Sequence, residues 1–151
     1  MTNSLLNQQL DALLFEETNS IANFSNAAAL LFQTIDDISW AGFYFYNQDT
    51  DTLDLGPFQG KVACMHIKNG TGVCGTALAN QSVQRIDNVH EFPGHIACDS
   101  DSNSEIVIPL FDNWGSPIGV LDIDSPKLNR FSIVDEQELI KFSNVLLQHI
   151  D

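Results

Sequence analysis

Basic residues are scarce in this sequence. Six Lys and Arg stand against twenty Asp and Glu, which gives a formal net charge of −14 at pH 7. Such a charge repels nucleic acid and anionic lipid surfaces at long range, so neither is expected as a partner. An acidic cleft would suit a ligand with an ammonium group, although a solvated acidic surface that keeps a protein soluble is the commoner origin of this balance.

Long apolar runs are also missing. No stretch of the 151 residues is apolar for long enough to span a bilayer. The first residues, M-T-N-S-L-L-N-Q-Q, lack the basic region and apolar run of a signal peptide. We therefore expect a cytoplasmic protein. With no internal repeat, linker or low-complexity tract, one domain spanning residues 1–151 is expected.

Cysteine occurs only three times, as Cys64, Cys74 and Cys98. An odd number in a cytoplasmic chain argues against a static disulfide framework, but it allows a transient disulfide with one thiol left over. Together with His66 these residues are of zinc-ligand type, yet the C-x-H and C-x9-C spacings lack the close cysteine pairs of structural zinc sites. Neither a metal nor another cofactor is expected.

Hydrophobic periodicity indicates the secondary structure. Apolar residues recur at helical spacing over 5–15 and 21–35, and a last helix begins after Ser132 as N-cap, with Asp135 three residues on. A shorter helix is predicted over 72–80. Strands are predicted over 39–46, 53–58, 62–67, 82–87, 105–111 and 117–123. The order predicts an α+β fold in which N-terminal and C-terminal helices pack on a mostly antiparallel sheet of about six strands.

Reactive side chains are concentrated in residues 92–105, F-P-G-H-I-A-C-D-S-D-S-N-S-E, with the thiol of Cys98 at the centre. Gly, Pro and Ser indicate a loop, and loops on a rigid scaffold often carry reactive side chains. A single cysteine taken by itself is equally consistent with a reactive thiol and with a buried, inert one. The other two cysteines favour reactivity.

Those two cysteines lie on different predicted elements, Cys64 on the strand 62–67 and Cys74 near a helix N-terminus, where the dipole is expected to lower the thiol pKa. The three thiols could meet at one end of the sheet. A thiol that attacks an oxidised substrate becomes a sulfenic acid, and a second thiol clears it as a disulfide, which an external reductant reopens.

Carboxylates surround this chemistry. Asp122 and Asp124 alternate along a strand and so share one face, which is costly if that face is buried and empty. Asp99 and Asp101 should raise the pKa of Cys98 and suppress its thiolate. Either His95 offsets them, or the substrate develops positive charge, as a protonated sulfoxide does, and the carboxylates stabilise it.

Six motifs occur in order along most of the chain. They are W-A-G-F-Y at 40–44, L-G-P-F-Q-G-K-V-A-C at 55–64, G-V-C-G at 72–75, F-P-G-H-I-A-C-D at 92–99, S-E-I-V-I-P at 104–109 and L-D-I-D-S-P at 121–126. This set, with all three cysteines in place, resembles the free methionine-(R)-sulfoxide reductases, which are built on a GAF domain. The N-terminal helices and the 113–117 turn match only in pattern.

The resemblance implies a GAF-like fold and the reduction of free L-methionine (R)-S-oxide to L-methionine, with the stereochemical preference resting on the resemblance alone. Cys98 matches the attacking cysteine, Cys64 the main resolving cysteine, and Cys74 a third cysteine whose part in the relay varies. The positions that match substrate-binding residues are the aromatic walls Trp40 and Tyr44 and the carboxylates Glu105, Asp122 and Asp124.

The chemistry of these residues, considered without the resemblance, also suits such a substrate. A free methionine sulfoxide brings an ammonium that needs carboxylates, a methyl group that needs an apolar wall and an oxygen that needs a proton donor. A Trp such as Trp40 is an effective wall for a small cationic or apolar group. The expected reductant is a thioredoxin-like protein, which this acidic chain, with Arg85 before the loop, could bind in its own way. A homodimer is compatible with the sequence, which does not determine the oligomeric state.

Two other functions are alternatives to the reductase. A GAF module that senses a small ligand is compatible with the fold, because one scaffold hosts many functions. Such a module has no need of three loop thiols. A thiol peroxidase would act on hydrogen peroxide and leave the carboxylates without a purpose.

Overall fold

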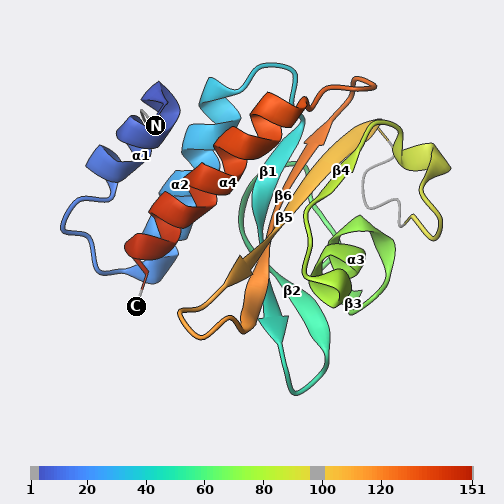
Figure 1. Ribbon diagram of the computed structural model, residues 1–151, viewed down its shortest axis with the longest axis horizontal. Coiled ribbons are helices and arrows are strands. Elements are labelled where there is room, and N and C mark those ends of the chain that lie inside the picture. The colour runs from blue at the N-terminus through green and yellow to red at the C-terminus, as the bar shows by residue number, and fades with distance from the viewer. Residues whose placement is uncertain (1–3, 96–100, 151) are drawn as a thin grey trace.

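The computed structural model describes residues 4–95 and 101–150. Its elements are α1 (Leu5–Leu13), α2 (Ser20–Thr34), β1 (Trp40–Asn47), β2 (Thr52–Gly60), β3 (His66–Lys68), α3 (Gly72–Asn80), β4 (Gln84–Ile86), a 3₁₀ turn (Val89–Glu91), β5 (Ser104–Phe111), β6 (Pro117–Ser125) and α4 (Ile133–Gln148). The α+β class predicted from the sequence is confirmed, and the elements are arranged around one sheet (Figure 1).

The six strands form one sheet in the order β3-β2-β1-β6-β5-β4. Every neighbouring pair is antiparallel, so the predicted sheet is confirmed in strand number and direction. The central strands β1 and β6 join two hairpins that are far apart in the sequence, β1-β2 and β5-β6. Residues of the 40–47 and 117–125 segments therefore lie next to each other.

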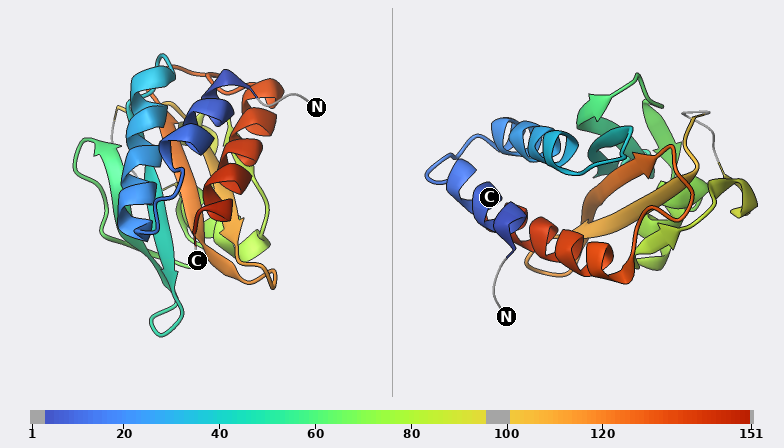
Figure 2. Two further views of the ribbon diagram at one scale, coloured as in Figure 1. Left: turned by 90° about the vertical axis from the view of Figure 1, so that its left-hand side faces the viewer. Right: turned by 90° about the horizontal axis from the view of Figure 1, so that it is seen from above.

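The two faces of the sheet are covered differently. Helices α2 and α4 lie on one face, where Leu31 and Phe142 pack against the strand residues Phe43 and Ile123, and α1 packs on these two helices from the side away from the sheet (Figure 2). The short helix α3 covers the other face. Because side chains alternate between faces along a strand, the residues next to Phe43 and Ile123 point toward α3.

Side chains cap the N-termini of both long helices, and the cap of α4 at Ser132 is the one predicted from the sequence. The Ser132 hydroxyl accepts a hydrogen bond from the Asp135 amide at 3.1 Å, and the Asp135 carboxylate accepts one from the Ser132 amide at 2.8 Å. This capping box starts α4, and at the start of α2 the Asn19 side chain accepts a single hydrogen bond from the Ala22 amide at 3.0 Å. A cap of this kind stabilises a helix by about 1 kcal/mol.

The predicted strand over 62–67 is wrong in its first half. Regular structure begins only at His66, and Cys64 lies before it in a loop. The Trp40 indole donates a hydrogen bond to the Lys61 carbonyl at 3.1 Å, and the Tyr44 hydroxyl donates one to the Cys64 carbonyl at 2.9 Å. These bonds turn the loop toward the face that α3 covers, instead of leaving it flat in the sheet.

Within the described residues, no helix combines the length and the apolar composition that crossing a membrane requires.

Candidate active site

Three acidic side chains meet on the α3 face of the sheet. Glu105 on β5 is paired with Asp124 on β6, which is paired in turn with Trp40 on β1. Directly paired residues share a face, and Asp122, two residues before Asp124, shares it too. The alternation of Asp122 and Asp124 predicted from the sequence is therefore confirmed, and β5 adds Glu105 to the same group.

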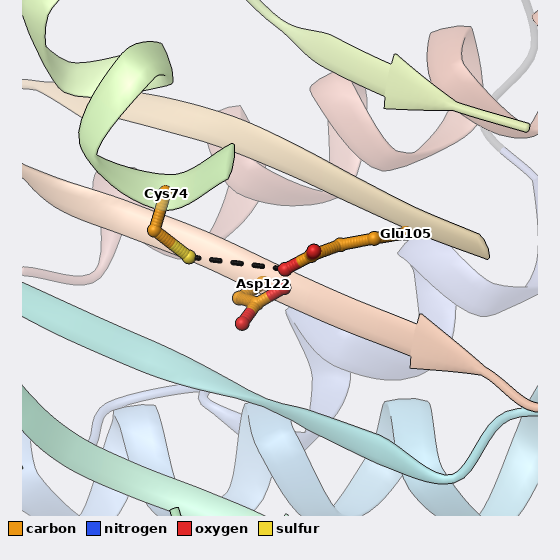
Figure 3. A group of neighbouring side chains, drawn as sticks. All are labelled: Cys74, Glu105 and Asp122. Carbon is orange, nitrogen blue, oxygen red and sulfur yellow. Dashed lines mark hydrogen bonds between the residues drawn. The ribbon is translucent and has the colours of Figure 1, made fainter. Parts of the chain in front are cut away.

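Cys74, on the helix that covers this face of the sheet, completes the cluster. It lies in the first turn of α3, and its Sγ is 3.9 Å from Oε2 of Glu105 (Figure 3). The polar atoms of Cys74, Glu105 and Asp122 all lie within 4.8 Å of one another. Each of the three residues is less than a tenth exposed. A thiol and two carboxylic groups thus share a buried space between α3 and the sheet.

Burial determines the protonation of the carboxylic groups. Removal from water, and then the negative charges of Asp122 and Asp124, raise the pKa of Glu105 well above its usual value. Burial also raises the pKa of Asp122, but hydrogen bonds from Glu105, Cys74 and Asp124 act in the opposite direction. Glu105 is therefore the member that best retains a proton, and the pair can supply an acid and a carboxylate side by side.

The prediction that the helix dipole lowers the pKa of Cys74 is wrong. Burial, followed by the charges of Asp122 and Glu105, raises the pKa of this thiol well above its ordinary value. The dipole of a helix end is equivalent to about half a unit charge. It is outweighed by neighbouring carboxylates in a space without water, so Cys74 is a protonated thiol that donates its hydrogen to Glu105.

Aromatic rings form one wall of the site. The Trp40 ring lies between Tyr44, with ring centroids 5.9 Å apart, and Phe58, at 5.2 Å, in stacked arrangements. Burial, and then the charge of Asp122, raise the pKa of Tyr44, so its hydroxyl stays protonated and donates to the loop. The structure places Trp40 and Tyr44 in the cavity lining beside the carboxylates, and Phe58, which the sequence did not indicate, stacks on the Trp40 ring without belonging to that lining.

A cavity of about 50 Å³ opens between these groups. The described residues that line it are Trp40, Tyr44, Val62, Ala63, Ile67, Thr71, Gly72, Val73, Cys74, His95, Ser102, Glu105, Asp122 and Asp124. None of these is Lys or Arg. Two buried oxygens of this set have no hydrogen-bond partner among the described residues, Oδ1 of Asp122 and Oγ of Ser102. Sequence reasoning missed Ser102, because serine in a Ser-rich loop is usually solvated.

The thiols are in different states. Cys64, half-buried in the loop next to the lining residue Ala63, is disulfide-bonded, whereas Cys74 is a free thiol. Cys98, predicted as the attacking residue, lies outside the described residues, as does Asp99. Asp101, which begins the next described segment, forms an ion pair of 2.7 Å with Lys61. Both side chains of that pair are exposed, so it contributes little stability.

His95 reaches the cavity lining, but it is not a strong source of positive charge. Burial, and then the neighbouring His90, lower its pKa. The ring centroids of the two histidines are 6.5 Å apart. Of the two ways in which the acidic surroundings of Cys98, the predicted attacking thiol, could be offset, charge on the substrate is therefore favoured over charge on His95.

The four residues of zinc-ligand type do not form one group among the described residues. The His66 ring bonds Oδ1 of Asp54 at 2.7 Å on the exposed side of β2 and β3. Cys74 instead lies with Glu105 and Asp122, a set that no local spacing in the sequence could indicate.

Comparison with known proteins identifies close relatives. A model of the GAF domain matches residues 19–151. The free methionine-R-sulfoxide reductase of Escherichia coli is 55% identical over 134 residues, which cover 89% of this chain and 79% of that protein. The enzyme of the same name from Saccharomyces cerevisiae is 44% identical over 135 residues, 86% of this chain and 75% of that protein.

A solved structure is also similar to this chain over most of its length. The free methionine-R-sulfoxide reductase of Neisseria meningitidis in complex with its substrate superposes with a TM-score of 0.91 at 40% identity, over 95% of this chain and 85% of that one.

Proposed function

This chain belongs to the free methionine-R-sulfoxide reductase family of GAF-domain proteins, and on that premise we propose that it reduces free L-methionine (R)-S-oxide to L-methionine with electrons from its own thiols. The observation that carries the proposal is the buried group of Glu105, Asp122 and Asp124, which faces an aromatic wall in a cavity without Lys or Arg among its described residues. Such a site suits a small ligand that brings its own positive charge.

The substrate's ammonium group is assigned to the carboxylates of Asp122 and Asp124. Oδ1 of Asp122 is buried without a hydrogen-bond partner among the described residues. Leaving a buried polar atom unsatisfied costs about 1–3 kcal/mol, which an ammonium would recover. The methyl group then packs on Trp40, and the sulfoxide oxygen lies near Glu105, the residue that best retains a proton.

The proposed reduction has three steps. The Cys98 thiolate attacks the sulfoxide sulfur while Glu105 protonates the sulfoxide oxygen; the oxygen passes to Cys98 as a sulfenic acid, and methionine leaves. The Cys64 thiol then attacks the sulfenic sulfur, which forms a disulfide and releases water. An external dithiol reduces the disulfide and restores both thiols. The role of Cys98 rests on its motif.

Cys74 has a different task. The disulfide state of Cys64 and the free state of Cys74 support a relay in which Cys64 and Cys98 carry the electrons. A buried thiol with a raised pKa is a poor nucleophile. Cys74 thus acts as a hydrogen-bond donor that positions Glu105.

A thioredoxin-like protein is the proposed reductant. Val62 and Met65, on either side of Cys64, are 89% and 70% exposed. Exposed apolar side chains next to a redox-active cysteine offer a contact surface for a protein disulfide reductase. Such a reductant and its cycle fit the reducing cytoplasm.

We propose that two copies of the chain form a homodimer through the side of the molecule opposite the cavity. Phe15 and Ile21, in and after the loop that joins α1 and α2, are 71% and 73% exposed. A second copy could cover these side chains. Sedimentation of the wild type and of Phe15→Ser/Ile21→Ser tests this: the dimer should dissociate in the variant, and a wild type that sediments as a monomer contradicts it.

The experiment that tests the function is incubation with a mixture of the free R and S sulfoxides and a dithiol, followed by chiral analysis. The R form should disappear and the S form should remain. A ligand sensor, the alternative, would consume neither form and would lose no thiols when the sulfoxide is added without a dithiol, whereas the reductase would lose two.

A further inference from the structure

The atoms of Cys74, Glu105 and Asp122 are spaced like the ligands of a metal ion. Sγ of Cys74 and Oε2 of Glu105 are 3.9 Å apart, and all three ligand atoms lie within 4.8 Å of one another. Zinc binds sulfur at about 2.3 Å and carboxylate oxygen at about 2.0–2.2 Å, so two ligand atoms on a tetrahedral ion are about 3.5 Å apart. Movements of about an ångström at the ends of the side chains would bring all three to one ion.

The backbone that carries these ligands is held in place. Cys74 lies in the first turn of α3, Glu105 on β5 and Asp122 on β6. The two strands are paired through Glu105 with Asp124 and Val107 with Asp122, and α3 packs on both strands. Binding therefore requires little ordering of the chain, which lowers its entropic cost.

An independent observation points to a ligand here. Oδ1 of Asp122 is buried without a hydrogen-bond partner among the described residues, and Asp122 is only 5% exposed. A buried carboxylate oxygen of this kind is satisfied by a hydrogen-bond donor or a cation. The cavity contains three carboxylic groups and a thiol but, in the part described, no Lys or Arg that could serve.

We propose that Cys74, Glu105 and Asp122 bind a thiophilic divalent cation, with Zn²⁺ as the type, in competition with the amino-acid substrate. A sulfur ligand selects Zn²⁺ or Cd²⁺ over Mg²⁺ and Ca²⁺, which prefer oxygen alone. On binding, the Cys74 thiol and the Glu105 carboxylic group both release their protons to solvent, so that the sulfur coordinates as thiolate and Glu105 as carboxylate. A water or Asp124, opposite Glu105 in the sheet, fills the fourth position.

The cation and the substrate's ammonium group claim the same oxygen of Asp122. Both therefore cannot occupy the cavity at once, and the cation inhibits by exclusion. Cation binding itself needs none of the redox chemistry. Only the competition rests on the proposed function.

The test uses the full chain with Cys64 and Cys98 replaced by Ser, so that Cys74 is the remaining thiol. Zn²⁺ is titrated by calorimetry, and Co²⁺ or Cd²⁺ serves as an optical probe, because a metal-thiolate bond gives a charge-transfer absorption. One ion per chain and a thiolate band are expected. Adding Glu105→Gln should weaken binding at least tenfold, whereas Glu16→Gln, at an exposed residue of the α1–α2 loop, should not change it.

A further Cys74→Ser should abolish the band and weaken Zn²⁺ binding about 100-fold, with circular dichroism confirming the fold. If that variant does not fold, the Glu105→Gln comparison decides. Absence of the band, or equal affinity in Glu105→Gln, overturns the site.

Free methionine sulfoxide is then titrated against the bound cation. It should raise the apparent Kd for Zn²⁺ in proportion to its concentration. If the wild type reduces the sulfoxide but the sulfoxide does not weaken Zn²⁺ binding, the shared site is wrong. Failure of the wild type to reduce the sulfoxide contradicts the proposed function instead and leaves the thiolate band unaffected.

Discussion

The hydroxyl of Tyr44 donates a hydrogen bond to the backbone carbonyl of Cys64 at 2.9 Å. The same ring lines the cavity and stacks on Trp40, whose indole holds Lys61 in the same loop. One strand, β1, therefore provides the wall of the site and anchors the loop that carries the proposed resolving thiol. In the proposed reaction, these two side chains therefore link substrate binding to disulfide formation.

Tyr44→Phe separates the two tasks, because it keeps the ring and removes the hydrogen bond. We expect the first turnover to change by no more than about threefold, stability to fall by about 1 kcal/mol, and disulfide formation to slow, so that sulfenic acid accumulates. Rapid mixing with a sulfenic-acid trap measures this. An unchanged rate of disulfide formation would show that the bond does not position Cys64.

Cys64→Ser should allow one turnover and then stall with Cys98 as sulfenic acid, since no thiol is left in the resolving position. The yield of methionine per chain without reductant measures this, with Cys98→Ser, which should yield none, as the matched control. Multiple turnover of Cys64→Ser with thioredoxin would assign resolution to Cys74. Turnover of Cys98→Ser above a tenth of wild type would place the attack elsewhere.

Glu105 should make the protein less stable as pH rises. Its pKa in the folded state is raised above the unfolded value of about 4.3. The unfolded chain therefore ionises first, so the contribution is fully present below pH 4 and is lost as pH rises through the folded pKa. Urea denaturation at pH 5 and pH 8 should show a larger loss for wild type than for Glu105→Gln. Equal losses in both would mean that Glu105 is ionised in the fold; Glu16→Gln is the exposed control.

Met65→Glu should impair reduction by thioredoxin and spare reduction by a small dithiol, because an added charge at this 70% exposed position opposes an apolar protein contact and leaves the pocket intact. We expect kcat/KM for thioredoxin to fall about tenfold. The rate with dithiothreitol is the internal control. An equal fall with both reductants, or no fall with either, contradicts the docking surface.

The sequence predicted the features that depend on local periodicity. Strand alternation placed Asp122 and Asp124 on one face, and the capping signal at Ser132 located the start of α4. The Cys64 loop was not predictable, because its path depends on hydrogen bonds from side chains 20 and 21 residues away. The pKa of Cys74 was predicted with the wrong sign for the same reason: the helix end is local, whereas Glu105 is 31 residues further along the chain.

The most direct test of the account compares kcat/KM for the free R sulfoxide of methionine with that for its N-acetyl derivative. Acetylation removes the ammonium charge and adds bulk where Asp122 and Asp124 should hold the amino group. A buried carboxylate without its partner costs several kcal/mol, so the ratio should exceed about 100 in favour of the free amino acid. A ratio near one would contradict the ammonium site, and with it the assignment of this cavity to a free amino acid.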